Sequence, residues 1–280
     1  MSYLRHIQKC NLYKADKFLP FIVAGLQVGE VKRSFATQLA EISVTFRQDT
    51  DALYWNCPAN DFASRNQAMA ELTETLLTAR LLPCRHGELY PVTTGLRDQP
   101  VFLMDRALVP YFGVRAFGQH MNGYIRRYGD IHMWIARRSL QKPNEPGKLD
   151  NMVAGGLPWG LRPEENLAKE CWEEAGIPAE LAAQAHATGH IAYRCETRQG
   201  LKPDTMYCYD LELPENFTPH CTDGEVEEFH LWPLERVAQQ VHDTDDVKLN
   251  CNLVIIDFLI RHGYITEEHP EYVDLLAGLR

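Results

Sequence analysis

Three glutamates, Glu170, Glu173 and Glu174, fall close together in the stretch from Lys169 to Ile177. At about 3.6 residues per turn, positions i, i+3 and i+4 project from one face of a helix. Carboxylates this close repel each other unless a cation joins them, and their oxygens suit hard ions such as Mg²⁺ or Mn²⁺. The spacing therefore predicts a helix that holds a divalent metal ion.

A glycine-rich loop precedes these glutamates and another glycine follows them. The loop runs from 154 to 160, Pro163 stands where a first-turn proline is tolerated, and Gly176 with Pro178 ends the helix. Bound Mg²⁺ is typically shared between carboxylates, waters and substrate phosphate oxygens. We expect the segment to hold a metal ion against a diphosphate, and the plainer alternative is a solvated acidic helix.

The segment from Gly155 to Ile177 resembles the Nudix box, GX5EX7REUXEEXGU, where U is an apolar residue. The matching positions are Gly155, Glu170, Glu173, Glu174, Gly176 and Ile177. Lys169 stands where arginine is usual, and Leu161 occupies the place of the first glutamate. That glutamate normally supports the metal cluster, so the number of ions stays open, and Glu164 or Glu165 would have to compensate from the helix start.

The resemblance implies a role for each charged residue of the box. Glu170 and Glu174 would be the first metal ligands, Glu173 a ligand or a base, and Lys169 would orient the carboxylates. Backbone groups at Gly155 and Gly156 would contact the substrate. In this family a glutamate outside the box, just before a strand aromatic, often completes the metal site, and Glu228 before Phe229 fits that pattern best. The alternative for Glu228 is a solvated strand edge.

Aromatic and basic residues near this segment are candidates to bind the rest of the substrate. The aromatic candidates are Trp134, Trp159, Tyr193, Tyr207 and Tyr209, with Trp159 favoured because it lies in the glycine loop. A flat or cationic ring would suit such a wall. Arg137 and Arg138 adjoin at a strand end and should face opposite ways, so that Arg138 could contact a phosphate or lie at the surface.

The likeness extends beyond the box to Nudix proteins related to thiamine pyrophosphokinase. It is carried by residues 122–124, 133–139, 146–151, 223–229, 250–251 and 261–264. This subfamily implies hydrolysis of diphosphates of damaged thiamine (oxo- and oxy-forms) to monophosphates. The alternatives are a Nudix hydrolase of ADP-ribose or another nucleoside diphosphate derivative, and a module that binds a diphosphate without cutting it.

Composition narrows the partners and the compartment. The net charge of −10 would repel a nucleic-acid backbone, so we expect a small-molecule diphosphate as partner and no nucleic acid. The eight cysteines form no C-x-x-C pair, and the first residues lack the apolar core of a signal peptide. We therefore expect reduced thiols, a cytoplasmic location and no membrane contact, and leave a homodimer open.

The chain is long enough for two folded units, and we place their boundary near residue 118. Residues 1–118 are expected to form a smaller α+β extension, with helices over 3–10, 32–41 and 66–82 and strands over 18–23, 88–92 and 99–104. Residues 119–280 alternate strands with helices over about 163–175, 233 onward and 249–262. This pattern predicts an α/β/α sandwich with a mixed sheet, the fold implied by the Nudix resemblance.

Overall fold

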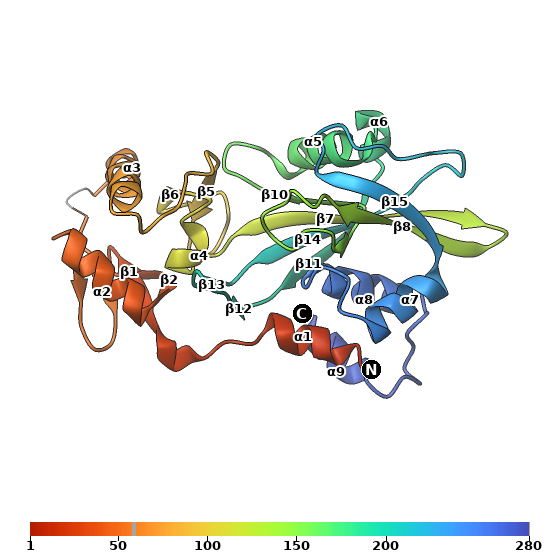
Figure 1. Ribbon diagram of the computed structural model, residues 1–280, viewed down its shortest axis with the longest axis horizontal. Coiled ribbons are helices and arrows are strands. Elements are labelled where there is room, and N and C mark those ends of the chain that lie inside the picture. The colour runs from red at the N-terminus through yellow and green to blue at the C-terminus, as the bar shows by residue number, and fades with distance from the viewer. Residues whose placement is uncertain (58–59, 280) are drawn as a thin grey trace.

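A mixed sheet forms the centre of the computed structural model, which describes residues 1–57 and 60–279 (Figure 1). Its strands are β7 (Phe117–Arg127), β8 (Asp130–Arg138), β9 (Leu149–Asp150), β10 (Val153–Gly156), β11 (His186–Ala192), β14 (Thr205–Glu212) and β15 (Val226–Pro233). The main order is β11-β14-β7-β8-β15, with β10 beside β7 and β9 beside β8. The β14–β7 pair is parallel and the β7–β8 pair is antiparallel, so the predicted mixed sheet is confirmed.

Helices cover both faces of this sheet. In Figure 1, α5 (Pro163–Ala175) and α6 (Ala179–Ala182) lie above it, and α7 (Leu234–Asp243) and α8 (Cys251–Arg261) lie below. Strand alternation supplies both cores: Met133 and Ile135 pack with α7 and α8, while Trp134 packs against the α5 side. The predicted α/β/α sandwich is therefore confirmed.

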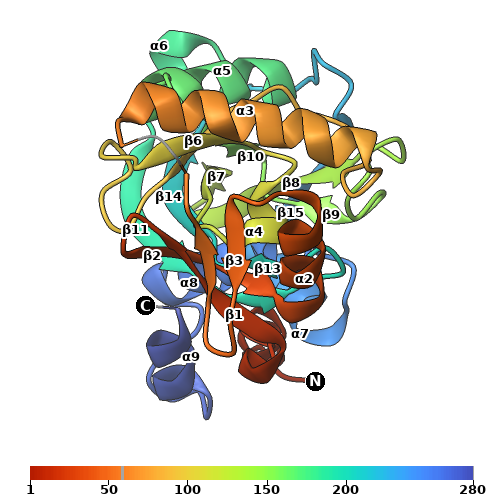
Figure 2. The same cartoon turned by 90° about the vertical axis from the view of Figure 1, so that its left-hand side faces the viewer.

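The N-terminal part has its own sheet and core, as an α+β unit should. Its elements are the 3-10 helix Ala15–Lys17, β1 (Phe18–Val23), β2 (Leu26–Lys32), α2 (Arg33–Ile42), β3 (Phe46–Gln48), β4 (Leu53–Trp55), α3 (Phe62–Thr78), β5 (Leu89–Val92), β6 (Phe102–Asp105) and α4 (Val109–Phe112). The sheet order is β2-β1-β4-β3, and β5 and β6 form a separate hairpin. Figure 2 looks onto this unit, with α3 across its top.

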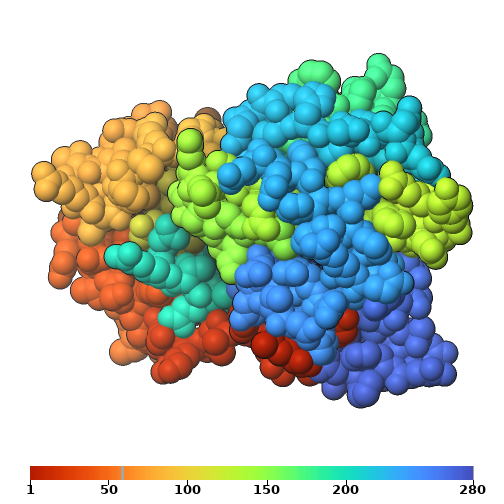
Figure 3. Space-filling model, turned by 45° about the vertical axis from the view of Figure 1, so that its right-hand side comes forward, coloured from red at the N-terminus to blue at the C-terminus, as the bar shows by residue number. Residues whose placement is uncertain are grey.

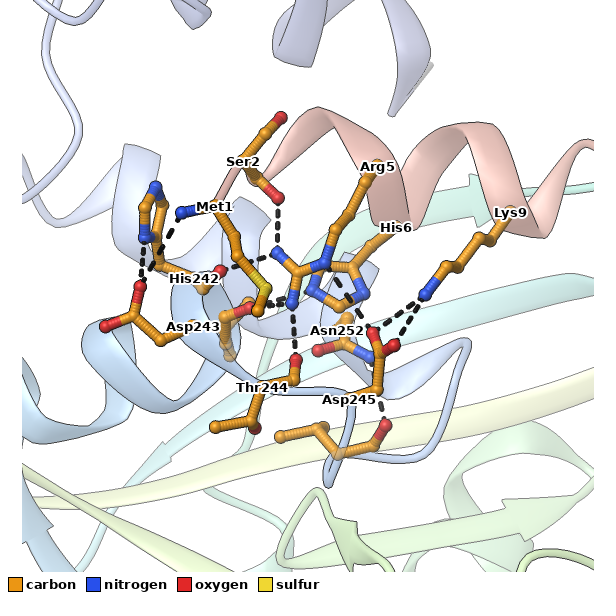
Figure 4. A network of polar contacts seen from close by, with 12 residues as sticks. Met1, Ser2, Arg5, His6, Lys9, His242, Asp243, Thr244, Asp245 and Asn252 are labelled. Carbon is orange, nitrogen blue, oxygen red and sulfur yellow. Dashed lines mark hydrogen bonds and ion pairs between the residues drawn. The ribbon is translucent and has the colours of Figure 1, made fainter.

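The first helix, α1 (Leu4–Cys10), packs away from that N-terminal sheet. It contacts α8 and the last helix, α9 (Tyr272–Gly278), and Figure 3 shows the red N-terminal residues against the blue C-terminal ones. In Figure 4, Arg5 donates to the carbonyl of His242 at 2.6 Å, and Lys9 pairs with Asp245 at 2.7 Å. Helix α1 therefore packs in the core of the second unit, and the boundary near residue 118, which falls just inside β7, stays a prediction.

Two differences from the predicted elements have clear causes. Helix α3 begins at Phe62 rather than near 66, because the Asp61 side chain accepts from the backbone N–H of Ser64 at 2.9 Å and caps the helix there. Helix α9 was not predicted, since its apolar pattern is short; Leu275 is buried in the core that α1 and α8 share. The small strands β12 (Cys195–Glu196) and β13 (Leu201–Lys202) form one further hairpin. None of the described helices is long and apolar enough to cross a bilayer.

Candidate metal site

Helix α5 spans 163 to 175, as the sequence predicted, and both of its ends are closed locally. Glu165 accepts from the backbone N–H of Arg162 at 3.1 Å in a capping box. At the other end Gly176 adopts a left-handed conformation with φ of 65°, which L side chains rarely take. Helical spacing places Leu167 and Cys171 side by side, next to the glutamates. Both are buried on the side of the helix that faces the sheet.

Two of the box glutamates fold back onto the strand that delivers the glycine loop. Glu174 Oε2 accepts from the backbone N–H of Ala154 at 2.7 Å. A Cβ atom added at Gly155 would lie only 2.3 Å from Cδ of Glu170, so any side chain there would displace that carboxylate. The glycine at 155 therefore lets the Glu170 carboxylate rest against the β10 backbone.

Glu174, the most buried of the three box glutamates, has no ion pair with any of the described basic side chains. Glu174 is 7% exposed. Burial, together with the charges of Asp150, Glu170 and Glu225, raises its pKa to about 8, and the hydrogen bond from the backbone N–H of Ala154 opposes this rise. Burial also raises the pKa of Glu170, which Lys169 only partly opposes. A donor set of buried carboxylates with uncompensated charge fits a hard divalent cation.

Lys169 lies at the exposed end of the same group. Its Nζ is 2.6 Å from Oε2 of Glu173 and 3.3 Å from Oε1 of Glu170. Lys169 therefore contacts two of the three box glutamates, the arrangement expected of a residue that orients them. Glu173 is the most open of the three, with 37% of its side chain exposed.

Glu228 forms an ion pair with Arg137. A bulge between Val226 and Glu228 shifts the β15 register, so that Glu228 is opposite Arg137 and accepts from its Nε at 2.9 Å. Glu225, three residues before Glu228, is the carboxylate of this segment whose charge reaches Glu170 and Glu174. Glu225 also pairs with Lys142. Strict alternation could not foresee the bulge, which places Glu228 against Arg137. Metal binding by Glu228 therefore stays a prediction, and Glu225 is a second candidate from the same segment.

Arg138 and Tyr193 are likewise committed elsewhere. Arg138 is buried and donates to Asp150 at 2.7 Å, so its guanidinium is part of a buried ion pair. Tyr193 lies in the core on the α8 side of the sheet, opposite α5, and donates to Asp204 at 2.9 Å. Tyr193 is buried on the side of the sheet opposite α5, and Arg138 is held by Asp150, so neither prediction of substrate contact gains support from this arrangement.

Trp159 remains at the loop and faces the N-terminal unit. Its ring is partly exposed and lies 6.5 Å from that of Phe62, centroid to centroid, and its backbone N–H donates to the carbonyl of Leu89 at 2.7 Å. Gly156 is equally close to that unit: an added Cβ would lie 1.9 Å from Oη of Tyr90. The glycine loop is therefore lined on one side by the β5–β6 hairpin.

The region around Leu161 shows no replacement carboxylate aimed at the other glutamates. The Leu161 carbonyl accepts from Arg97 at 3.1 Å. Glu165 is engaged by Arg162 in the helix cap, and the charge of Glu164 acts on Tyr209. Compensation for Leu161 by Glu164 or Glu165 therefore stays a prediction.

A second cluster of ligand-type side chains lies inside the molecule, but its charge does not suit a cation. Among the described residues His120, Asp150 and Cys251 bring ligand atoms within 4.8 Å of one another, all buried. Asp150, however, already contacts Arg138 at 2.7 Å and Lys248 at 3.3 Å. Two cations on one carboxylate leave the cluster positive, so we interpret it as a structural network.

Three residues that reach the loop from the N-terminal unit belong to no sequence motif. Tyr90, Arg97 and Arg106 come from the β5–β6 hairpin and its flanks, and each lies beside the segment 156–161. These residues carry no characteristic spacing. Only the packing of one unit on the other could have identified them.

Two protein-family models match this chain, one for each of its two parts. A model described as NUDIX domain matches residues 123–252, and one described as a domain of unknown function, DUF4743, matches residues 2–116. Nudix hydrolase 24, chloroplastic, of Arabidopsis thaliana is 41% identical over 283 residues, covering 100% of this chain and 78% of that protein. Nudix hydrolase 20, chloroplastic, of the same plant is 40% identical over 290 residues, with the same two coverages. The solved MutT/nudix family protein from Enterococcus faecalis gives a TM-score of 0.44 at 12% identity, covering 78% of this chain and 80% of that one.

These relatives overturn one expectation from the sequence. We expected a cytoplasmic protein, whereas both plant relatives are named chloroplastic. The expectation rested on the missing apolar core of a secretory signal, and targeting segments for other organelles are amphipathic and lack such a core. The prediction of a cytoplasmic location is therefore wrong.

Proposed function

The chain belongs to the Nudix hydrolase family, and we propose that it cleaves a small-molecule diphosphate with a divalent ion, Mg²⁺ or Mn²⁺, held by Glu170, Glu173 and Glu174. One observation carries this proposal. Glu174 is buried beside Glu170, and none of the described cationic side chains forms an ion pair with it, while its backbone partner Ala154 starts the glycine loop. A metal ion would supply the missing charge at the place where the loop can receive phosphate oxygens.

A divalent ion bound there would offset charge that develops on the phosphate oxygens and lower the pKa of a water. The chain's own groups position the reaction. The N–H of Ala154 fixes Glu174, and Lys169 fixes Glu173 and Glu170. Glu173, the most exposed of the three, is the candidate to accept the proton of the attacking water. Glu225 supports the same cluster from the loop before β15.

The substrate we propose is a thiamine-type diphosphate, in particular an oxidised form, with the monophosphate as product. Its support is the subfamily resemblance and the position of Trp159, an aromatic side chain beside the loop with Phe62 behind it. Stacking on an aromatic ring contributes about 0.5–1.5 kcal/mol beyond area burial. Trp159→Ala should therefore raise KM for a thiamine diphosphate about threefold to tenfold and spare simple diphosphates.

A metal-dependent turnover screen tests the proposal. Thiamine diphosphate, its oxo- and oxy-forms, ADP-ribose and a dinucleoside polyphosphate would be compared with Mg²⁺, with Mn²⁺ and with a chelator, and the products identified. We expect the highest kcat/KM for an oxidised thiamine diphosphate. A hundredfold preference for ADP-ribose or a dinucleotide would overturn the thiamine assignment and leave the metal-dependent hydrolase standing.

The second candidate function is a module that binds a diphosphate without cutting it, and Leu161 in place of the usual glutamate is the feature that favours it. The same screen separates the two. Binding of ligand and metal with no product over several hours would support the module and contradict the hydrolase.

A further inference from the structure

The β5–β6 hairpin of the N-terminal unit is fastened to the glycine loop at several points. Arg97, between the two strands, donates to the carbonyls of Pro158 and Leu161. The carbonyl of Leu89 in β5 accepts from the backbone of Trp159 at 2.7 Å. In Figure 1 the hairpin lies between the N-terminal sheet and the loop that follows β10. The loop is thus positioned from outside the domain that carries the box.

Arg106, just after β6, brings a positive charge to this contact. A Cβ atom added at Gly156 would lie 3.2 Å from Cζ of Arg106. One nitrogen of the guanidinium, Nη1, donates to Oε2 of Glu88 at 2.7 Å, and Cζ lies 5.7 Å from the centroid of the Tyr90 ring. The side chain stays 40% exposed. Burial alone would lower the pKa of Arg106, but the charges of Tyr90, Glu88 and Glu170 outweigh it and raise the pKa.

The other basic side chains close to the carboxylates are already engaged. Lys169 is held by Glu173, Arg137 by Glu228, and Arg138 by Asp150. Arg97 is directed at backbone carbonyls of the loop. Arg106 has one carboxylate partner, Glu88, which is itself 36% exposed, and the described residues supply no further acceptor for its remaining donors. Those donors can therefore be given to a ligand that lies on Gly156.

We propose that Arg106 binds a phosphate oxygen of the diphosphate substrate, so that the N-terminal unit completes the active site. A guanidinium presents several N–H donors in a fixed fork that matches phosphate oxygens. The guanidinium lies next to Gly156 and its charge reaches Glu170, so this positive charge lies close to the loop that is proposed to receive the phosphates. This assignment rests on the proposed function for the identity of the ligand, and it adds a residue from a different unit to the site.

The test compares four variants of the whole chain, of which the fourth, Arg106→Lys, keeps the charge. Arg106→Gln removes the proposed phosphate ligand. Arg126→Gln is the matched control, because Arg126 also pairs with a glutamate, Glu212, and lies 5.8 Å from a tyrosine ring centroid, at the far end of β7. Glu88→Gln removes the ion pair and leaves Arg106 in place. Binding of methylenediphosphonate, a non-hydrolysable diphosphate, would be measured by calorimetry with Mg²⁺, and kcat and KM would be measured with the best substrate from the turnover screen.

We expect Arg106→Gln to weaken methylenediphosphonate binding and raise KM by about tenfold or more, because a charge-assisted hydrogen bond is lost. Arg126→Gln should change neither, and Glu88→Gln should leave binding equal or tighter, since the guanidinium loses a competing acceptor. Arg106→Lys should restore part of the affinity by restoring the charge.

Equal weakening by Arg106→Gln and Glu88→Gln, with a shared loss of thermal stability, would show a structural role and overturn the assignment. Unchanged binding in Arg106→Gln, or no methylenediphosphonate binding by the parent protein, would overturn it as well. Failure of the proposed function looks different: the parent protein would release no product from any diphosphate, while the calorimetric comparison of the variants would still decide whether Arg106 holds the diphosphate.

Discussion

Two buried carboxylates, Asp150 and Glu174, lie in the same domain and have opposite electrostatic surroundings. Asp150 is 4% exposed and Glu174 is 7% exposed. Burial alone would raise the pKa of Asp150, but Lys248 and Arg138 outweigh it and hold the pKa at about 2. Burial raises the pKa of Glu174 to about 8, where one backbone N–H is the main group that opposes it.

The difference separates a carboxylate with a structural role from the one that we propose binds the metal ion. Asp150 has its countercharges within the chain, so its ion pairs are complete when the chain folds. Glu174 lies beside Glu170, and the chain provides Lys169 only at the outer end of that group. An unpaired buried carboxylate costs free energy, and such a cost is usually retained where a ligand relieves it. The following experiments are arranged from the largest expected effect to the smallest.

Neutralising Asp150 should have the largest effect, and it should be on stability. Asp150→Asn leaves Arg138 and Lys248 buried without their carboxylate, which typically costs about 3–5 kcal/mol of unfolding free energy. Urea denaturation of the variant and of the exposed control Asp16→Asn would measure it. A loss below about 1 kcal/mol would mean that the network is relaxed enough to do without Asp150.

Neutralising Glu174 should act on turnover and leave the fold intact. Glu174→Gln keeps the shape but removes a charge from the proposed metal site, so we expect at least about a hundredfold loss of kcat at saturating Mg²⁺. The metal-free variant should be as stable as the parent or more stable, which is the opposite sign to Asp150→Asn. Glu180→Gln, at an exposed glutamate, is the control. If the kcat of Glu174→Gln stayed within a few-fold of the parent value, Glu174 would not belong to the metal site.

The two carboxylates also predict opposite pH limits for the metal-free protein. The pKa of Asp150 is about 2 against an ordinary 3.8, so its stabilisation is present above pH 3.8 and is lost as pH falls toward 2. The raised pKa of Glu174 gives the reverse: stability is highest below pH 4.5 and is lost as pH rises toward 8.

The unfolding free energy should fall by about 2 kcal/mol or more at each pH limit, since one pKa unit corresponds to roughly 1.4 kcal/mol. Urea titrations between pH 2 and 9 in chelator would measure both. Glu174→Gln should flatten the alkaline limit alone, and persistence of the full alkaline loss in that variant would assign it to another group.

The smallest effect is expected at Leu161, where the box lacks a carboxylate. Leu161→Glu adds negative charge near the cluster, so the Mg²⁺ concentration for half-maximal activity should fall about twofold to tenfold. Rate measured against Mg²⁺ would show it, and Leu161→Gln controls for side-chain size. A higher Mg²⁺ requirement would indicate that Glu164 or Glu165 already fills the role, and an unchanged requirement would show that position 161 points away from the ion.

Much of the fold was predictable because the signals are local. Helix α5 begins and ends where Pro163 and Gly176 indicated, since a first-turn proline and a left-handed glycine act on their own neighbours. The division of Leu167 and Cys171 from the glutamates follows from helical periodicity alone. The position of Glu228 against Arg137 was not predicted, because a bulge changes the register by one residue, and the residues around it carry no signal of a bulge.

The sequence by itself determined the acidic helix, the glycine loop before it and the alternation that builds a two-faced sheet, because each depends on spacing along a few turns or strands. Only the tertiary structure decided which charges meet. Arg138 and Lys248 are 110 positions apart yet both reach Asp150, while Arg106 of the N-terminal unit reaches Gly156. Electrostatic energy depends on distance through space and on burial, and neither quantity is written in the local order of residues.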